Sequence, residues 1–93
     1  MEEKAKQVAE LLKILSNENR LLILCALQNG KMNVGEIASH VQGITKPALS
    51  QHLTLLKTAG ILESDKQGMN VIYSIADVRV KELFNTLRRY YCD

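Results

Sequence analysis

Apolar and polar residues alternate along this chain with two different periods, one typical of helices and one typical of strands. Apolar residues three or four positions apart, bounded by residues that favour helix ends, predict helices over 3–15, 18–28, 33–41, 45–60 and 77–91. Two short apolar runs, 61–62 and 71–75, predict strands, with a hairpin tip at 65–68 between them. The predicted order of elements is therefore α-α-α-α-β-β-α.

The third and fourth predicted helices have clear end signals and are separated only by a short turn. Asn33 and Glu36 form the pattern of a capping box, in which each side chain accepts a hydrogen bond from the other residue's backbone N–H. Thr45 is placed to cap the next helix, and Pro47 fits within its first turn. This order predicts a mainly α fold with a small β-hairpin, the winged helix-turn-helix. The predicted units are the helix-turn-helix, 33–60, and the wing, 61–75, within a single domain, 1–93.

The apolar patterns of the remaining helices predict which of them lie in the core and which could pack against a second copy of the chain. The second helix is apolar nearly all round, which predicts that it is the central, buried helix. The terminal helices, 3–15 and 77–91, are amphipathic, and the sequence predicts no sheet for them to cover. A two-fold homodimer would bury these helices and present two reading helices to the two half-sites of an inverted-repeat DNA site. The alternative is that they only close the core of one chain.

The composition fits a small helical domain. The chain has 93 residues, of which 46% are hydrophobic and only 4% aromatic. Its longest apolar run, 21–27, is far short of the ~20 residues that span a bilayer, and its first residues are charged rather than a signal peptide. We therefore expect a soluble, cytoplasmic protein with no membrane partner.

The distribution of charge is more informative than the net charge of +2. No carboxylate occurs between Glu36 and Glu63, and this interval contains two lysines and two histidines: His40, Lys46, His52 and Lys57. A surface without acids across a reading helix suits a phosphate partner such as double-stranded DNA. The alternative is an ordinary polar helix face that has few acids by chance.

Two longer motifs resemble the ArsR/SmtB family of bacterial repressors. Residues 12–24 resemble that family's Leu-Ser/Ala-x-x-x-Arg-Leu-x-Ile-Leu run, and residues 49–62 resemble its recognition helix and the exit from it. The resemblance covers nearly the whole chain and implies a homodimeric winged-helix repressor that leaves DNA when it binds an inducer. It implies candidate DNA contacts in the recognition helix, Lys46, Ser50, Gln51 and His52, and in the wing, Lys66 and Gln67. The plainer alternatives are that Ser50 bonds to its own helix and that His52 packs structurally.

The resemblance does not extend to the family's usual metal sites. Residues 33–41 contain no Cys where thiolate-type members carry Cys-x-Cys, and 77–79 lack the His that other members place two residues after an Asp. The last helix instead carries four cations that would repel a metal ion: Arg79, Lys81, Arg88 and Arg89. We therefore expect no metal ligand at these positions and no cofactor.

Cys25 and Cys92 are the only two cysteines of the chain. Their positions resemble the sulfide- and persulfide-responsive branch of the family, in which a Cys of the second helix and one near the C-terminus become linked. The resemblance implies that this link releases the operator. Arg88 and Arg89 would favour the reactive thiolate of Cys92, and Cys25, among Leu and Ile, would be its resolving partner. The alternatives are a metal- or metalloid-responsive repressor that uses the same two thiols, or a core filler and a frayed chain end.

The sequence gives little support to functions other than DNA binding. The sequence contains no Cys-x-x-Cys, phosphate-binding loop or Ser-His-Asp order, so we do not expect an enzyme. A winged helix used only for protein association is the alternative from another class. Carboxylates in 45–60 would have favoured it, and that segment has none.

Overall fold

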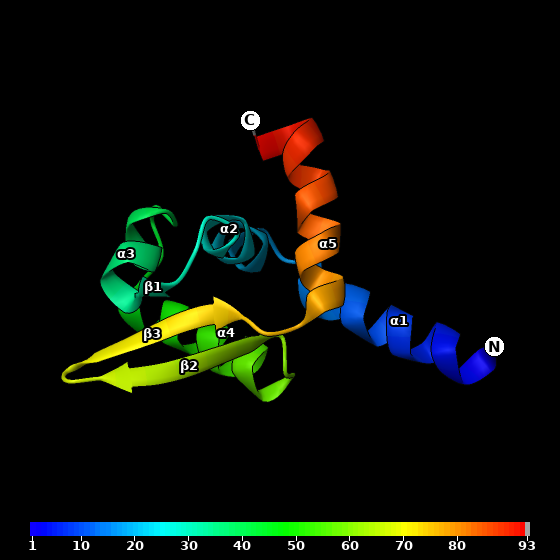
Figure 1. The fold of residues 1–93 in the computed structure, drawn as a ribbon, viewed down its shortest axis with the longest axis horizontal. Helices are drawn as coiled ribbons and strands as arrows, with labels where there is room; N and C mark the ends of the chain where they lie inside the picture. Colours follow the sequence, from blue (N-terminus) through cyan, green and yellow to red (C-terminus); the bar gives the residue numbers. More distant parts are fainter. Residues whose placement is uncertain (93) are drawn as a thin grey trace.

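The computed structural model describes the backbone of residues 1–92 and the side chains of residues 1–91. Its elements, in chain order, are α1 (Glu2–Leu15), α2 (Glu18–Leu27), β1 (Met32–Asn33), α3 (Val34–Ser39), α4 (Lys46–Thr58), β2 (Leu62–Gln67), β3 (Asn70–Ile75), α5 (Val78–Leu87) and the π-helical turn η1 (Arg88–Cys92). Figure 1 shows α1 extending away from the rest of the molecule, with the N-terminus at its far end. Within the described chain, no helix is both long enough and apolar enough to cross a bilayer.

The capping signals predicted from the sequence are confirmed. The Asn33 Oδ1 atom accepts the Glu36 N–H at 2.8 Å, and the Glu36 Oε1 atom accepts the Asn33 N–H at 3.0 Å, so the capping box of α3 is complete. Thr45 Oγ1 accepts the Ala48 N–H at 3.2 Å at the start of α4, with Pro47 in the first turn. These contacts set where both helices of the helix-turn-helix begin.

Helix α3 ends at Ser39, earlier than the predicted end at Val41. The Ser39 hydroxyl donates to the Glu36 carbonyl at 2.6 Å, and the His40 N–H bonds to the Ile37 carbonyl instead of continuing the α-helical pattern. The side chain thus competes with the backbone for a helical acceptor, which ends the helix. Val41 is still buried, because the turn directs it into the core.

The wing is longer than predicted, and its tip lies elsewhere. Residues 65–67, expected at the tip, belong to β2, and the turn is at 68–69, with Gly68 at φ 62°. A two-residue turn of this kind needs a positive φ, which glycine supplies without strain. The polar residues of β2 concealed the strand, because most of its side chains face solvent and need no apolar pattern.

The sequence also missed a strand. Strand β1 pairs antiparallel with β3, so the sheet has three strands in the order β1-β3-β2. Met32 and Asn33 lie opposite Tyr73 and Ile72. A strand of two residues has no periodicity to read, and only its pairing partner identifies it.

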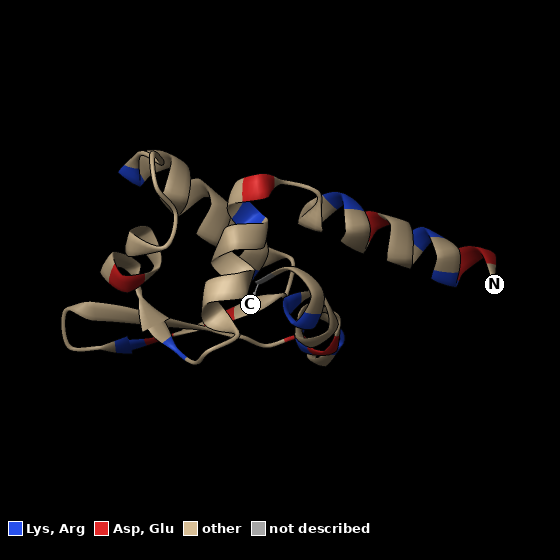
Figure 2. Ribbon diagram, turned by 90° about the horizontal axis from the view of Figure 1, so that it is seen from above, with Lys and Arg blue, Asp and Glu red and all other residues tan. Residues whose placement is uncertain are grey.

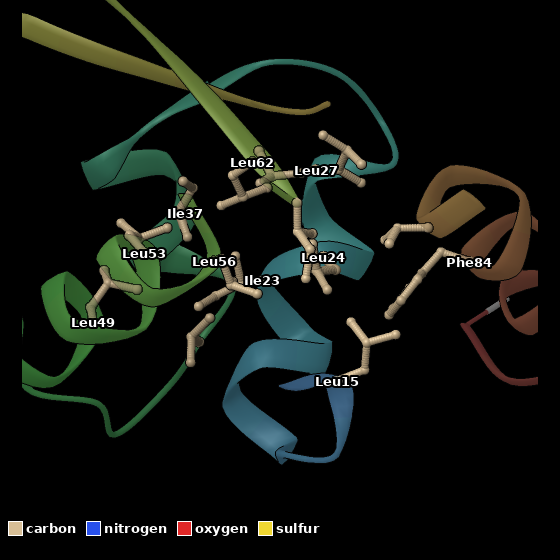
Figure 3. Packing of buried hydrophobic residues seen from close by; sticks show 14 residues of the cluster. Leu15, Ile23, Leu24, Leu27, Ile37, Leu49, Leu53, Leu56, Leu62 and Phe84 are labelled. Carbon is tan, nitrogen blue, oxygen red and sulfur yellow. The ribbon is translucent and has the colours of Figure 1, made fainter. Parts of the chain in front are cut away.

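One apolar core holds the helices and the sheet together. It is formed by the last residue of α1, by α2, α3, α4, the start of β2, the end of β3 and the inner face of α5. Figure 3 shows Ile23 of α2 beside Leu56 of α4. The most deeply buried large side chains are Ile23, Leu24, Ile37, Leu49, Leu53, Leu56, Ile61, Val41 and Val80. The described side chains of the core are therefore aliphatic except for Phe84, which extends it onto α5.

The prediction that α2 is the central, buried helix is correct for one face of the helix and wrong for the other face in the single chain. Ile23 and Leu24 are fully buried, but Leu21 and Leu22 remain 38% and 47% exposed. A helix has more faces than one small core can cover, so the outer face of α2 faces solvent beside α5. The predicted last helix, 77–91, also differs from the structure, because α5 ends at Leu87 and the chain continues as η1. Tyr90 and Tyr91 are exposed there, so no core contact imposes the α-helical repeat.

Candidate nucleic-acid interface and cysteine groove

Helix α4 has one apolar face, which is buried in the core, and one polar face, which is exposed to solvent. Leu49, Leu53 and Leu56 are buried in the core. Ser50 and Gln51 are exposed between them in sequence, and Lys46 is exposed in the first turn. Since side chains three or four positions apart share a face, Gln51 lies on the side of the helix opposite the core. A side chain in that position is the one that meets base edges when a helix enters a major groove.

The two flanks of α4 differ in charge. Lys46, Ser50 and Lys57 follow one another at i, i+4 and i+11, so they share one flank. Ala48 and His52 share the other flank, which carries no Lys or Arg of α4. The four predicted contacts of α4 therefore occupy three positions around the helix rather than one patch.

His52 is half-buried on that second flank, and its environment disfavours the charged ring. Burial lowers the pKa of His52 below its usual value, and the positive charge of Arg20 in α2 lowers the same pKa further. The ring is therefore neutral at pH 7, so it offers one hydrogen-bond donor and one acceptor.

The two predicted wing contacts lie on opposite faces of the hairpin. Successive residues of a strand point to opposite faces. Lys66 shares its face with Leu62, which is buried in the core beside α4. Gln67 shares the other face with Asp65 and Glu63, and its Nε2 atom donates to Asp65 Oδ2 at 3.4 Å. Lys66 is thus on the side of α4, and Gln67 is on an acidic side.

The charged residues elsewhere on the chain are more evenly mixed. Figure 2 shows acidic and basic residues interleaved along α1, which lies away from the helix-turn-helix. In α4, the first turn has no acidic residue and the last turn has Lys57. The absence of acids is therefore a property of α4 and the turns on either side of it, and not of the whole described surface.

Cys25 lies at a groove between α2 and the C-terminal helices. The groove has a volume of about 410 Å³ and is lined by Glu18, Leu21, Leu22, Cys25, Phe84, Leu87 and Tyr91. Cys25 is half-buried, so it does not lie in a fully buried helix as predicted. The exposed side of α2 gives it access to the groove. The backbone of Cys92 ends η1, directly after Tyr91, but its side chain and residue 93 lie outside the described part of the protein.

The two sides of this groove are held together by Gln28, which follows α2. Its Nε2 atom donates to the Lys81 carbonyl at 3.1 Å and to Asn85 Oδ1 at 2.7 Å, both in α5. The end of the second helix and the last helix are therefore neighbours in the fold. Over the described residues, no group of three or more His, Cys, Asp or Glu side chains is arranged to hold a metal ion.

Arg20, which the sequence analysis did not single out, lies close enough to α4 for its charge to lower the pKa of His52. Its signal was present at the start of α2, where Asn17 accepts the Arg20 N–H at 3.1 Å. Arg20 thus has the position that Glu36 has after Asn33, and at that position a carboxylate favours the helix terminus. A cation at that position is unfavourable for the helix N-terminus, and an anion outside the helix would offset this effect.

Helices α3 and α4, followed by the β2–β3 hairpin, form a winged helix-turn-helix, the fold of many DNA-binding regulators. A family profile described as bacterial regulatory protein, arsR family, matches residues 17–64. The transcriptional activator HlyU of Vibrio cholerae is 37% identical over 92 residues, covering 99% of this chain and 84% of HlyU. The biofilm growth-associated repressor of Xylella fastidiosa is 37% identical over 92 residues, covering 99% of this chain and 80% of the repressor.

Solved structures agree with this result. The reduced form of HlyU from Vibrio cholerae has a TM-score of 0.93 at 36% identity, covering all of this chain and 97% of the other. A homodimeric winged helix-turn-helix DNA-binding domain of Mycobacterium bovis has a TM-score of 0.79 at 33% identity, covering 94% of this chain and 80% of the other. The chain belongs to the arsR family of bacterial regulatory proteins. It is therefore a DNA-binding transcription regulator, as the sequence predicted, and belongs to a family of regulators rather than enzymes.

Proposed function

We propose that this regulator is a homodimeric repressor that binds an inverted-repeat operator and releases it when Cys25 and Cys92 become covalently linked. One observation carries the sensing part of the proposal. Cys25 and Tyr91 line the same groove, and Cys92 is the next residue after Tyr91. The chain therefore brings the second cysteine to the end of the helix that faces the first.

The homodimer is supported by apolar surface that the single chain leaves exposed. Val8 and Leu12 on α1 are 50% and 52% exposed, although α1 is anchored to the core at its other end by Leu15. A protruding amphipathic helix is stable only when its apolar face is covered. The structural neighbour from Mycobacterium bovis is described as homodimeric, which favours a second copy of this chain as the cover.

The dimer would place two α4 helices in successive major grooves. Gln51, at the outer face, is placed for base readout, and Lys46 and Ser50 on one flank are placed for the backbone. His52 is placed for a neutral hydrogen bond from the other flank. Lys66 is the stronger wing candidate, since Gln67 shares its face with two carboxylates that would repel phosphate.

The proposed inducer is a hydropersulfide, RSSH, which both accepts electrons and supplies a leaving group. The Cys92 thiolate attacks the terminal sulfur of RSSH, forming a Cys92 persulfide and releasing RS⁻. The Cys25 thiolate then attacks the inner sulfur of this persulfide, the Sγ atom of Cys92, which forms the disulfide, breaks the sulfur–sulfur bond of the persulfide and releases HS⁻. Overall, two thiols are oxidised, and RSSH is reduced to RSH and H₂S. A reductant reverses the link.

The link would act through the angle between α2 and the C-terminal helices. Because α5 packs on the core through Val80 and Phe84, a tether at its far end pulls against these contacts. A hundredfold loss of DNA affinity requires that the linked state disfavour the bound geometry by about 2.7 kcal/mol, at about 1.4 kcal/mol per tenfold.

The test begins with selection of an operator from a random duplex library, followed by fluorescence-anisotropy titration of the reduced protein. Cys25→Ser and Cys92→Ser should each bind the operator as the wild type does when reduced. Each should also stay bound after treatment with a hydropersulfide that lowers wild-type affinity about a hundredfold. Cys25→Ala and Cys92→Ala serve as second variants that remove the added polarity of serine.

Two other outcomes would contradict parts of the proposal. If either single variant still releases DNA on persulfide treatment, the two-cysteine mechanism is wrong. If zinc or cadmium releases the reduced wild type but not the cysteine variants, the same thiols sense a metal instead. Sedimentation of the reduced protein measures the dimer separately, and a monomer bound to a single half-site would refute the inverted-repeat arrangement.

A further inference from the structure

Arg20 is a cation placed where neither its helix nor its surroundings favour one. It lies in the first turn of α2, three residues after the capping residue Asn17. A helix N-terminus carries a partial positive charge, so a carboxylate stabilises this position and a cation destabilises it. The first turn of α3 shows the favourable arrangement, with Glu36 at the same place.

Within residues 1–91, the Arg20 side chain also lacks an anionic partner. Its Nε atom is buried and has no hydrogen-bond partner, and no carboxylate of residues 1–91 lies within ion-pair distance of it. The nearest carboxylate in sequence, Glu18, faces the groove beside Cys25 on another side of α2. A partly desolvated cation without an anion is unfavourable, and binding an anion removes that penalty.

Arg20 lies next to the recognition helix. Its positive charge lowers the pKa of His52 in α4, so the two side chains lie within range of each other's charge. The core explains why. Ile23 follows Arg20 by one turn and Leu56 follows His52 by one turn, and these two fully buried side chains lie side by side in Figure 3. Arg20 and His52 thus each lie one turn before this core contact in their own helices. Arg20 is half-buried, so its side chain still reaches solvent.

Arg20 places a cation beside the flank of α4 that has no Lys or Arg of its own. A helix in a major groove has a phosphate backbone on each side of it. Lys46 and Lys57 serve one flank, whereas the flank of Ala48 and His52 has no cation of its own. Arg20 is the cation adjacent to that second flank, brought there by a different helix.

We propose that Arg20 binds a backbone phosphate of the DNA on the flank of α4 that carries His52, as a DNA contact from outside the helix-turn-helix. The inference rests on the proposed DNA binding. The phosphate would be the anion that residues 1–91 do not provide, and the planar array of donors on the guanidinium suits phosphate oxygens. The contact adds affinity and register but reads no base.

The test is the salt dependence of binding to a labelled duplex of random sequence, which measures phosphate contacts without the operator. Each phosphate contact contributes about 0.9 to the slope of log K against log salt, so two Arg20 residues in a dimer contribute about 1.8. Arg20→Gln should lose this amount, and Arg20→Lys should retain most of it. Arg79→Gln, the same change at an arginine paired with Asp77, should leave the slope unchanged.

A merely structural role gives a different result. If Arg20→Gln lowers the melting temperature but binds with the wild-type slope, Arg20 only supports α4 and the inference is wrong. If the wild type binds no duplex at all, the proposed DNA binding fails instead.

A measurement on the wild-type protein covers the case in which Arg20→Gln does not fold. Modification of Arg20 by phenylglyoxal, followed by mass spectrometry of peptides, should slow severalfold when the duplex is present at low salt, while modification of Arg79 should not change. Equal rates at Arg20 with and without duplex would overturn the proposal.

Discussion

The placement of Lys66 and Gln67 on opposite faces of the wing leads to a sharp prediction. Replacing Lys66 by Gln removes a cation from the face that carries Leu62 and lies beside α4. Exchanging the two residues, by Lys66→Gln together with Gln67→Lys, keeps the charge and the composition but moves the cation to the face of Asp65 and Glu63. The two variants therefore differ only in whether the wing still carries a cation.

The expected magnitude follows from one phosphate contact per wing. Two contacts in a dimer contribute about 1.8 to the slope of log K against log salt. Raising the salt fourfold, from about 50 to about 200 mM, should therefore weaken wild-type binding by about 12-fold more than it weakens binding of Lys66→Gln. In the exchanged variant the carboxylates beside position 67 offset the new cation, so its slope should equal that of Lys66→Gln.

The assay is an anisotropy titration of a labelled duplex at several salt concentrations, with all variants at the same pH. Circular dichroism melts check that the hairpin variants are folded. Recovery of the wild-type slope by the exchanged variant would refute the reasoning, because it would show that the face of the wing does not decide the contact. An unchanged slope in Lys66→Gln would remove the wing lysine from the interface.

Two further predictions concern the recognition helix and the start of α5. Gln51→Ala should weaken binding to the selected operator by about 1–3 kcal/mol and reduce discrimination among bases, with little effect on random duplex, measured by competition titration; equal losses on both DNAs would contradict base readout. Hydrogen bonding from Arg79 holds the pKa of Asp77 below its usual value, so its charged form stabilises the folded state above the unfolded pKa, and that stability is lost as the pH falls through the folded pKa. The advantage of the wild type over Asp77→Asn in free energy of unfolding should therefore be full at about pH 5 and shrink below about pH 4, near the ordinary Asp pKa; a constant difference measured by urea titration would show that the carboxylate is not coupled to folding.

Much of the helix-turn-helix could be predicted from the sequence because its signals are local. The bonds of Asn33 with Glu36 and of Thr45 with Ala48 join residues three positions apart, so the chain carries both partners within one turn. The leucines of α4 recur at the helical period, which identifies its inner face without knowledge of what it packs against. The same holds for the candidate contacts Ser50 and Gln51, which are exposed as the period requires.

Other features were decided by contacts between distant residues. Strand β1 exists because Met32 and Asn33 pair with β3, some forty positions later. The length of the wing follows from the pairing of β2 with β3, which the polar residues of β2 do not indicate. The groove beside Cys25 depends on how α5 packs across α2, where Gln28 bonds to Lys81 and Asn85. Arg20 becomes a candidate contact only because Ile23 and Leu56 pack together and bring α2 beside His52. Periodicity and caps describe one element at a time, whereas a site formed between elements depends on packing that no single element contains.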